Sequence, residues 1–233
     1  VRLGRTELKV ADIAFGTFPL RPGDEKVVRH AVDLGINYFD TAEGYGNGKS
    51  EEAVGRALAG GLRKEVYIAT KIFTGADTSS GEMMARLESC LKRLKTDYVD
   101  IFFNHAVNDI ATLKNQEWLE FAEQAKVLGK VRYFGMSGHA GRLKECVRYA
   151  VEKDMFDVLL LATNFGDDPA FYERFTRSFD MVANQQGLQK LMSEAKTKDM
   201  GVIAMKVLRG AKLNDMRPYE RQGFTYSQAA CRW

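Results

Sequence analysis

Four side chains that can hold or transfer a proton stand at or near the ends of expected β-strands, namely Asp40, Tyr45, Lys71 and His105. Singly, each has an ordinary structural explanation, such as a turn cap, a surface phenol, a lysine reaching solvent or a core histidine. An ionised lysine at a buried strand end is costly unless a carboxylate lies near it. Because Asp40 and Lys71 end adjacent strands, we expect them to neutralise each other. The set therefore predicts one acid–base site.

A glycine-rich segment between a strand and a helix, Gly44–Ser50, invites a second interpretation as a phosphate-binding loop. That loop requires a glycine five positions before Gly48, where this chain has Glu43. A carboxylate there would repel the phosphates that the loop must surround. We therefore rank a nucleotide hydrolase third, behind the two function classes described below.

The elements that must position these residues recur along the chain. Seven short β-branched or aromatic runs are expected to be strands: 13–17, 36–41, 66–71, 98–104, 131–137, 157–163 and 202–206. Helical periodicity lies between them, and Ser50 and Ser80, each followed by glutamates, are expected to cap helices. Strands recur about every 31 residues, the size of a βαβ unit. This alternation predicts a parallel sheet, either doubly wound or closed into a barrel.

Two segments depart from that repeat. Residues 2–10 are expected to form a small hairpin, and the aromatic-rich stretch 164–187 is expected to pack down a short extra helix. The chain stops within an expected helix over 226–233, so a barrel would lack its eighth unit.

Composition narrows the class of protein. The 233 residues are 45% hydrophobic and 28% charged, as in one globular domain spanning 1–233. A net charge of +3 with both signs scattered argues against nucleic acid or an anionic membrane as partner. Cys90, Cys146 and Cys231 form no CxxC pair, so we expect free thiols in the cytoplasm and no metal site. The longest clean apolar run, 158–162, is far too short to cross a bilayer.

Several motifs together resemble the aldo-keto reductase family. They are Gly35–Gly46 with Ser50-Glu51-Glu52 and Gly55, Ala69-Thr70-Lys71, Tyr98–Ile101 leading to His105, Gly129–Arg132 leading to Gly135-Met136-Ser137, and Gly201–Lys206. The resemblance runs in order from about residue 3 to the end. It implies a TIM-type (β/α)8 barrel with an N-terminal β-hairpin, its eighth βα unit missing from this chain. It also implies reduction of an aldehyde or ketone by hydride transfer from NADPH, with NADH not excluded.

The resemblance assigns the catalytic roles. Tyr45 would donate the proton, Lys71 would stabilise the resulting phenolate, Asp40 would hold Lys71 charged, and His105 would orient the substrate carbonyl. Phe18, Phe73 and Trp118 are candidates for an apolar pocket, although Trp118 lies on a helical face and is better explained as core.

The resemblance also implies a cofactor site at Gly16, Thr17, Asp40, Ser137, Gly138, Met205, Lys206, Leu208 and Gly210. Three positions depart from the family pattern. Gly138 replaces an asparagine, Leu160 replaces a glutamine, and Met205 replaces an aromatic residue that stacks on the nicotinamide. The neighbouring His139 either takes part of the lost role or is an unpartnered loop histidine.

These departures leave a second function class open, a non-catalytic barrel that senses cofactor or serves as a scaffold subunit. Retention of all four chemical residues argues against it. The substrate, the choice between NADP and NAD, and the oligomeric state are not readable from the sequence.

Overall fold

A seven-stranded parallel sheet organises the computed structural model, which describes residues 1–139, 141–163, 187–207 and 228. Each strand pairs with its sequence neighbours in parallel, in the order β1-β2-β3-β4-β5-β6-β7. The strands are β1 (Phe15–Gly16), β2 (Tyr38–Asp40), β3 (Tyr67–Ile72), β4 (Val99–Asn104), β5 (Val131–Gly138), β6 (Val158–Ala162) and β7 (Gly201–Met205).

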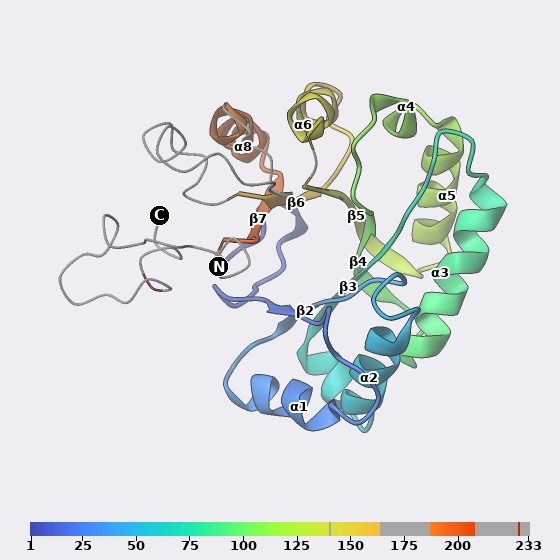
Figure 1. Ribbon diagram of the computed structural model, residues 1–233, viewed down its shortest axis with the longest axis vertical. Helices are drawn as coiled ribbons and strands as arrows, with labels where there is room; N and C mark the ends of the chain where they lie inside the picture. The colour runs from blue at the N-terminus through green and yellow to red at the C-terminus, as the bar shows by residue number, and fades with distance from the viewer. Residues whose placement is uncertain (140, 164–186, 208–227, 229–233) are drawn as a thin grey trace.

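Strand order separates the two sheet types that the sequence left open. A doubly wound sheet reverses its order at a switch point, which this sheet does not do. Right-handed crossovers in one direction place every helix on the same face, and Figure 1 shows the helices as an outer arc around the curled sheet. They are α1 (Glu25–Asp33), α2 (Lys49–Ala57), α3 (Ser80–Leu94), α4 (Ile110–Leu113), α5 (Gln116–Val127), α6 (Leu143–Glu152) and α8 (Leu188–Thr197). The winding is that of a barrel.

Apolar side chains fill both faces of the sheet. In β4 all six residues are buried, and successive side chains alternate between the two sides. Phe102 belongs to the outer cluster with the helices, whereas Phe103 belongs to the inner cluster that the curled sheet surrounds. Trp118 is 3% exposed and packs in the outer cluster, which confirms the expectation that it is core.

The N-terminal hairpin lies against the inner cluster. Arg2 and Lys9 form an antiparallel bridge around the 3-10 turn η1 (Gly4–Thr6). Gly4 has a φ of +50°, and a Cβ there would lie 2.2 Å from the backbone nitrogen of Gly201 at the start of β7. The predicted hairpin is therefore confirmed, and it closes the end of the sheet at which the strands begin.

Two predicted helix caps are wrong. Helix α2 begins at Lys49 after Gly48, whose φ of +82° turns the chain, and Ser50 lies inside the helix. Its hydroxyl group is used elsewhere, because it donates to Thr17 on the neighbouring loop. Helix α3 is capped by Ser79, whose Oγ accepts from the backbone N–H of Glu82 at 3.2 Å, one residue before the predicted cap.

Other expectations have mixed outcomes. Strand β4 ends at Asn104, so His105 is the first residue beyond it. Cys90 and Cys146 are buried free thiols, as expected. The expected elements in 164–187 and 226–233, apart from residues 187 and 228, lie outside the described residues. Within the described ranges no helix has the length and apolar character needed to cross a membrane.

Candidate active site

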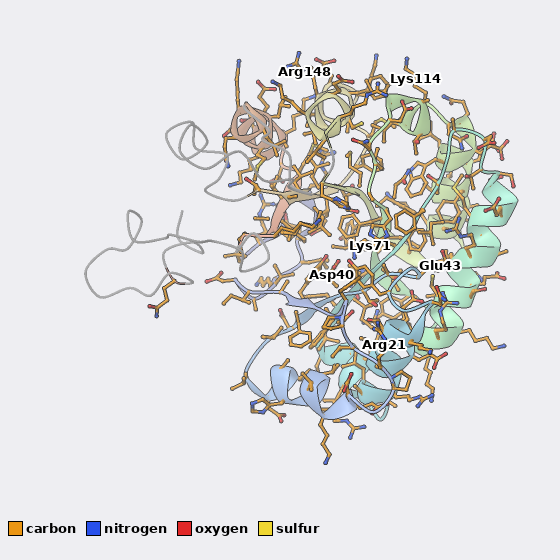
Figure 2. The ribbon with its side chains drawn as sticks, viewed as in Figure 1. Arg21, Asp40, Glu43, Lys71, Lys114 and Arg148 are labelled. Atoms are coloured by element: carbon orange, nitrogen blue, oxygen red, sulfur yellow. The ribbon has the colours of Figure 1, made fainter. Side chains whose placement is uncertain are left out.

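A buried ammonium group forms the centre of the site. Asp40 is the last residue of β2, and Lys71 lies on the adjacent β3, where only 1% of it is exposed. Lys71 Nζ donates to Asp40 Oδ2 at 2.7 Å, to the carbonyl oxygen of Thr41 at 2.6 Å and to Tyr45 Oη at 3.3 Å. These three acceptors use all three protons of the ammonium group. Figure 2 shows Asp40 and Lys71 meeting inside the arc of helices.

Burial and ion pairing act on Asp40 in opposite directions. Burial raises the pKa of the Asp40 carboxyl, and the Lys71 ammonium partly opposes that rise. The Lys71 charge also lies 4.7 Å from the centre of the Tyr45 ring. The carboxylate, the ammonium and the phenol therefore form one contiguous cluster, as the sequence predicted.

A tight turn after β2 positions Tyr45. The backbone N–H of Tyr45 donates to Ala42 at 3.0 Å, and the N–H of Ser50 donates to the Tyr45 carbonyl at 3.2 Å. Gly46 and Gly48 both have positive φ angles, which glycine adopts without strain. The glycines of this segment thus serve a turn that presents a phenol.

His105 completes the cluster from the loop after β4. Its backbone N–H donates to Ile72 of β3 at 2.9 Å. The imidazole stacks on Phe73 with ring centres 4.2 Å apart and meets the edge of Tyr45 at 5.8 Å. Its Nδ1 is buried and has no hydrogen-bond partner within the described part of the chain.

Burial is the main reason that His105 is a neutral group. It lowers the pKa of the imidazole to about 3, and the charge of Lys71 contributes next. Smaller contributions come from His139 after β5 and Lys206 after β7. A neutral imidazole at this position can donate one N–H to an acceptor oxygen.

Two exposed aromatic rings flank the phenol and the imidazole. Phe18 is 64% exposed and meets the Tyr45 ring edge-on at 5.1 Å, and Phe73 is 50% exposed while it stacks on His105. Apolar rings beside convergent polar groups are typical of small-molecule sites.

The residues expected to bind cofactor at the end of β1, Gly16 and the following Thr17, are only partly free to do so. Gly16 is exposed, and nothing lies within 4 Å of a Cβ built there. Thr17 is fully buried, and its Oγ1 donates to the Asp40 carbonyl at 2.9 Å and accepts from Ser50. Thr17 thus ties β1 to β2, whereas Gly16 leaves an open backbone surface.

The cofactor-binding candidates of β5 and β7 lie at the carboxyl ends of their strands. Ser137 is buried, and its Oγ accepts the N–H of Ala106, which follows His105, at 3.0 Å. A Cβ at Gly138 would lie 2.3 Å from Leu143 Cδ1. The local packing therefore leaves no room for the asparagine side chain of the family pattern without a shift of Leu143. Met205 and Lys206 are half-buried at the end of β7. Leu208 and Gly210 lie outside the described residues, and Leu160 belongs to the inner apolar cluster.

Sequence reasoning missed an ion pair beside the site. Arg86 of α3 contacts both carboxylate oxygens of Glu43, two residues before Tyr45. In the sequence, Glu43 argues against a phosphate loop and belongs to the Gly35–Gly46 motif, but neither observation predicts a partner for it. The pair is 43 positions apart, and no spacing rule connects residues at that separation.

Comparison with known proteins gives this geometry a context. The Aldo/keto reductase family model matches residues 13–226. L-galactose dehydrogenase of Arabidopsis thaliana is 30% identical over 233 residues, covering 94% of this chain and 68% of that protein. A protein named probable voltage-gated potassium channel subunit beta, also from Arabidopsis thaliana, is 36% identical over 118 residues, covering 44% of this chain and 36% of that protein. The alignments therefore span only part of each relative's length.

A solved structure supplies the match in fold. An aldo-keto reductase from Klebsiella pneumoniae, solved in complex with NADPH, superposes with a TM-score of 0.72 at 23% identity, covering 97% of this chain and 77% of that one. Its fold is that of the curled sheet and outer helices described above. The eighth βα unit of the barrel does not occur within the described residues. The extent of the family match and the strand order agree, and the chain belongs to the aldo/keto reductase family.

Proposed function

We propose that this chain transfers a hydride between a nicotinamide cofactor and the carbonyl carbon of an aldehyde or ketone, with Tyr45 as the proton donor. The observation that carries the proposal is the buried Lys71 ammonium, held between the Asp40 carboxylate and the Tyr45 phenol. A structural ion pair between Lys71 and Asp40 has no need of a phenol as a further partner of the lysine. The exposed rings of Phe18 and Phe73 favour substrates with an apolar part.

The described residues fit a nicotinamide cofactor. Gly16 offers an unobstructed backbone at the end of β1, and Ser137 keeps its own hydroxyl proton for donation after accepting from Ala106. Lys206 adds a positive charge at the end of β7. We propose that these groups, with Asp40, Thr17, Gly138, Met205, Leu208 and Gly210, hold the cofactor, NADPH by preference. When bound, the cofactor supplies the hydride for carbonyl reduction.

The chain's own residues handle the proton. Tyr45 Oη lies 3.3 Å from Lys71 Nζ, so loss of the phenolic proton to a substrate oxygen leaves a phenolate beside an ammonium. Asp40 and the Thr41 carbonyl fix that ammonium in place. The neutral His105 orients the carbonyl by donating one N–H to its oxygen, which aligns the carbon for attack.

One relative favours a second candidate function. The match to a protein named probable voltage-gated potassium channel subunit beta supports the scaffold form of that candidate, a barrel that serves as a subunit of a larger assembly. The L-galactose dehydrogenase match covers more of this chain and supports catalysis. We therefore rank the enzyme first, acting in either direction on a small carbonyl or alcohol. A cytoplasmic location and a single domain over 1–233 stay predictions.

Replacing Tyr45 by phenylalanine tests the proposal, because it removes one oxygen and keeps the ring. With NADPH and a panel of aldehydes, we expect kcat to fall on the order of a hundredfold to ten-thousandfold. We expect the dissociation constant of NADPH, measured by its fluorescence, to stay within about twofold. Tyr149→Phe on α6 is the matched control and should behave as wild type.

Three outcomes are distinguishable. Turnover by wild type that is lost in Tyr45→Phe supports the enzyme. NADPH binding without turnover of any aldehyde, or of any alcohol with NADP⁺, supports the sensing or scaffold subunit. Full activity in Tyr45→Phe removes Tyr45 from the mechanism and refutes the proposal.

A further inference from the structure

Arg86 links two loops that carry active-site residues. Its Nε and Nη2 donate to the Glu43 carboxylate, the Nη2 contact with Oε2 being 2.5 Å. Its Nη1 donates to the carbonyl oxygen of Phe73 at 2.7 Å. Glu43 belongs to the loop after β2, and Phe73 follows β3, so one guanidinium group spans the two loops. Figure 2 shows Glu43 beside Lys71, consistent with the 3.0 Å hydrogen bond from the Glu43 N–H to the Lys71 carbonyl.

Each end of this link bears directly on the acid–base cluster. Glu43 lies two residues before Tyr45, whose oxygen contacts Lys71. Phe73 carries the ring that stacks on His105 at an angle of 20°. The Phe73 ring also touches the first loop, since a Cβ at Gly44 would lie 3.0 Å from Phe73 Cε2. The Arg86 contacts therefore join the loop that carries the phenol to the residue whose ring stacks on the imidazole.

The geometry goes beyond that of an ordinary surface ion pair. Isolated surface pairs contribute little stability, and their side chains are usually well exposed. Here both side chains are only 25% exposed, the carboxylate is held by two nitrogens, and a third nitrogen is fixed on a backbone carbonyl. A planar, forked donor group reaches both oxygens of a carboxylate and a separate carbonyl oxygen from widely spaced nitrogens, whereas all three donors of a lysine sit on one atom.

We infer that Arg86 and Glu43 are positioning residues, which hold Tyr45 and the Phe73–His105 stack in register for proton transfer. The kinetic consequence rests on the proposed function. The structural consequence, loss of the Phe73–His105 stack, does not.

The environment of His105 makes the stack measurable. The titratable groups that face it are Tyr45, Lys71 with its partner Asp40, His139 and Lys206. None of these facing groups is itself substituted in the Arg86 and Glu43 variants. The lowered pKa of His105 comes first from burial, so freeing the Phe73 ring should return it toward its ordinary range. Replacing Arg86 and Glu43 together removes one charge of each sign and leaves the net charge unchanged. A higher pKa of His105 in that double variant is then explained by solvent exposure of the imidazole and not by a change in net charge.

The experiment compares Arg86→Gln, Arg86→Lys and the double variant Arg86→Gln/Glu43→Gln. Glu88→Gln is the matched control. Glu88 lies on the same helix as Arg86, and its carboxylate pairs with Lys130 Nζ at 2.7 Å, away from the site. The chain has three histidines, so a His105→Gln variant assigns the His105 ring proton in NMR spectra. Readouts are the ring-current shift and titration of that proton, kcat, KM and NADPH affinity.

We expect Arg86→Gln and the double variant to lose the ring-current shift of His105 and to titrate at higher pH. We expect kcat to fall on the order of tenfold to a hundredfold, with NADPH affinity within about twofold and partial recovery in Arg86→Lys. Unchanged His105 spectra together with unchanged kcat would overturn the inference. If wild type shows no turnover, the proposed function fails while the NMR arm still decides this inference. Should Arg86→Gln fail to fold, Arg86→Lys and Glu43→Gln supply the same comparison.

Discussion

Replacement of Lys71 by methionine tests whether the buried charges of the site depend on each other. The change keeps the apolar stem and deletes an ammonium that donates to Asp40, Thr41 and Tyr45. At the 2.7 Å separation of Lys71 and Asp40, the gross attraction is about 6 kcal/mol at an effective dielectric constant of about 20. Desolvation of both groups offsets part of it.

The expected net loss follows from what remains in the variant. Asp40 would be left as a largely buried carboxylate, with 15% of its side chain exposed, and without a cation. Breaking a buried pair in this way costs about 3–5 kcal/mol. We therefore expect the free energy of unfolding of Lys71→Met to fall by about that amount, a large share of the stability of an ordinary domain. The double variant Lys71→Met/Asp40→Asn removes the stranded charge, and we expect it to be more stable than the single variant.

Urea titrations of the wild type and of the single and double variants, followed by circular dichroism, measure these differences. The pH dependence of stability gives a second test at Asp40, whose pKa is already raised by burial. Without Lys71 that pKa rises further, so the folded state takes up a proton more readily than the unfolded chain. The deficit of the single variant relative to the double variant should therefore be largest near neutral pH and should shrink as the pH falls. A single variant within about 1 kcal/mol of wild type, or a double variant no more stable than the single, would refute the pairing.

Two further predictions concern His105 and the contact between α2 and α3. Because burial lowers the pKa of His105 to about 3, the unfolded chain binds a proton first on acidification. The free energy of unfolding should therefore fall between about pH 6.5 and pH 3, by at most about 1.4 kcal/mol per pH unit. We expect His105→Gln to flatten that part of a stability–pH profile. A Cβ at Gly55 would lie 2.5 Å from the Arg93 carbonyl oxygen and 2.6 Å from the carbonyl carbon of Leu94, so Gly55→Ala should cost about 1–3 kcal/mol in urea unfolding. Gly81→Ala, at an open position of α3, is its control and should be neutral or slightly stabilising; equal effects at the two glycines would contradict the close approach of the helices.

The strands and the chemical residues could be predicted from sequence because both depend on local patterns. Continuous apolar runs such as 158–162 form strands buried on both faces, and the structure places β6 there. Asp40 and Lys71 follow from the same logic, since polar residues at the carboxyl ends of neighbouring parallel strands meet at one edge of the sheet.

Helix caps could not be predicted as well, because a serine side chain has several competing uses. Ser50 precedes two glutamates, as a capping residue would, yet its hydroxyl bonds to Thr17, 33 positions earlier. The turn at Gly48 places the helix cap two residues earlier than Ser50. A local signal failed here because a distant partner made a buried hydrogen bond available.

The sequence by itself determined the alternation of strands and helices, the hairpin, and which four groups meet in one cluster. Each of these follows from residue types at short spacing or at the ends of expected strands. Only the tertiary structure decided that the sheet keeps a single winding direction, that burial makes His105 a neutral donor, and that Arg86 spans Glu43 and the Phe73 carbonyl. Those features depend on how segments that are distant in the sequence pack together and exclude water. No short-range pattern specifies that packing.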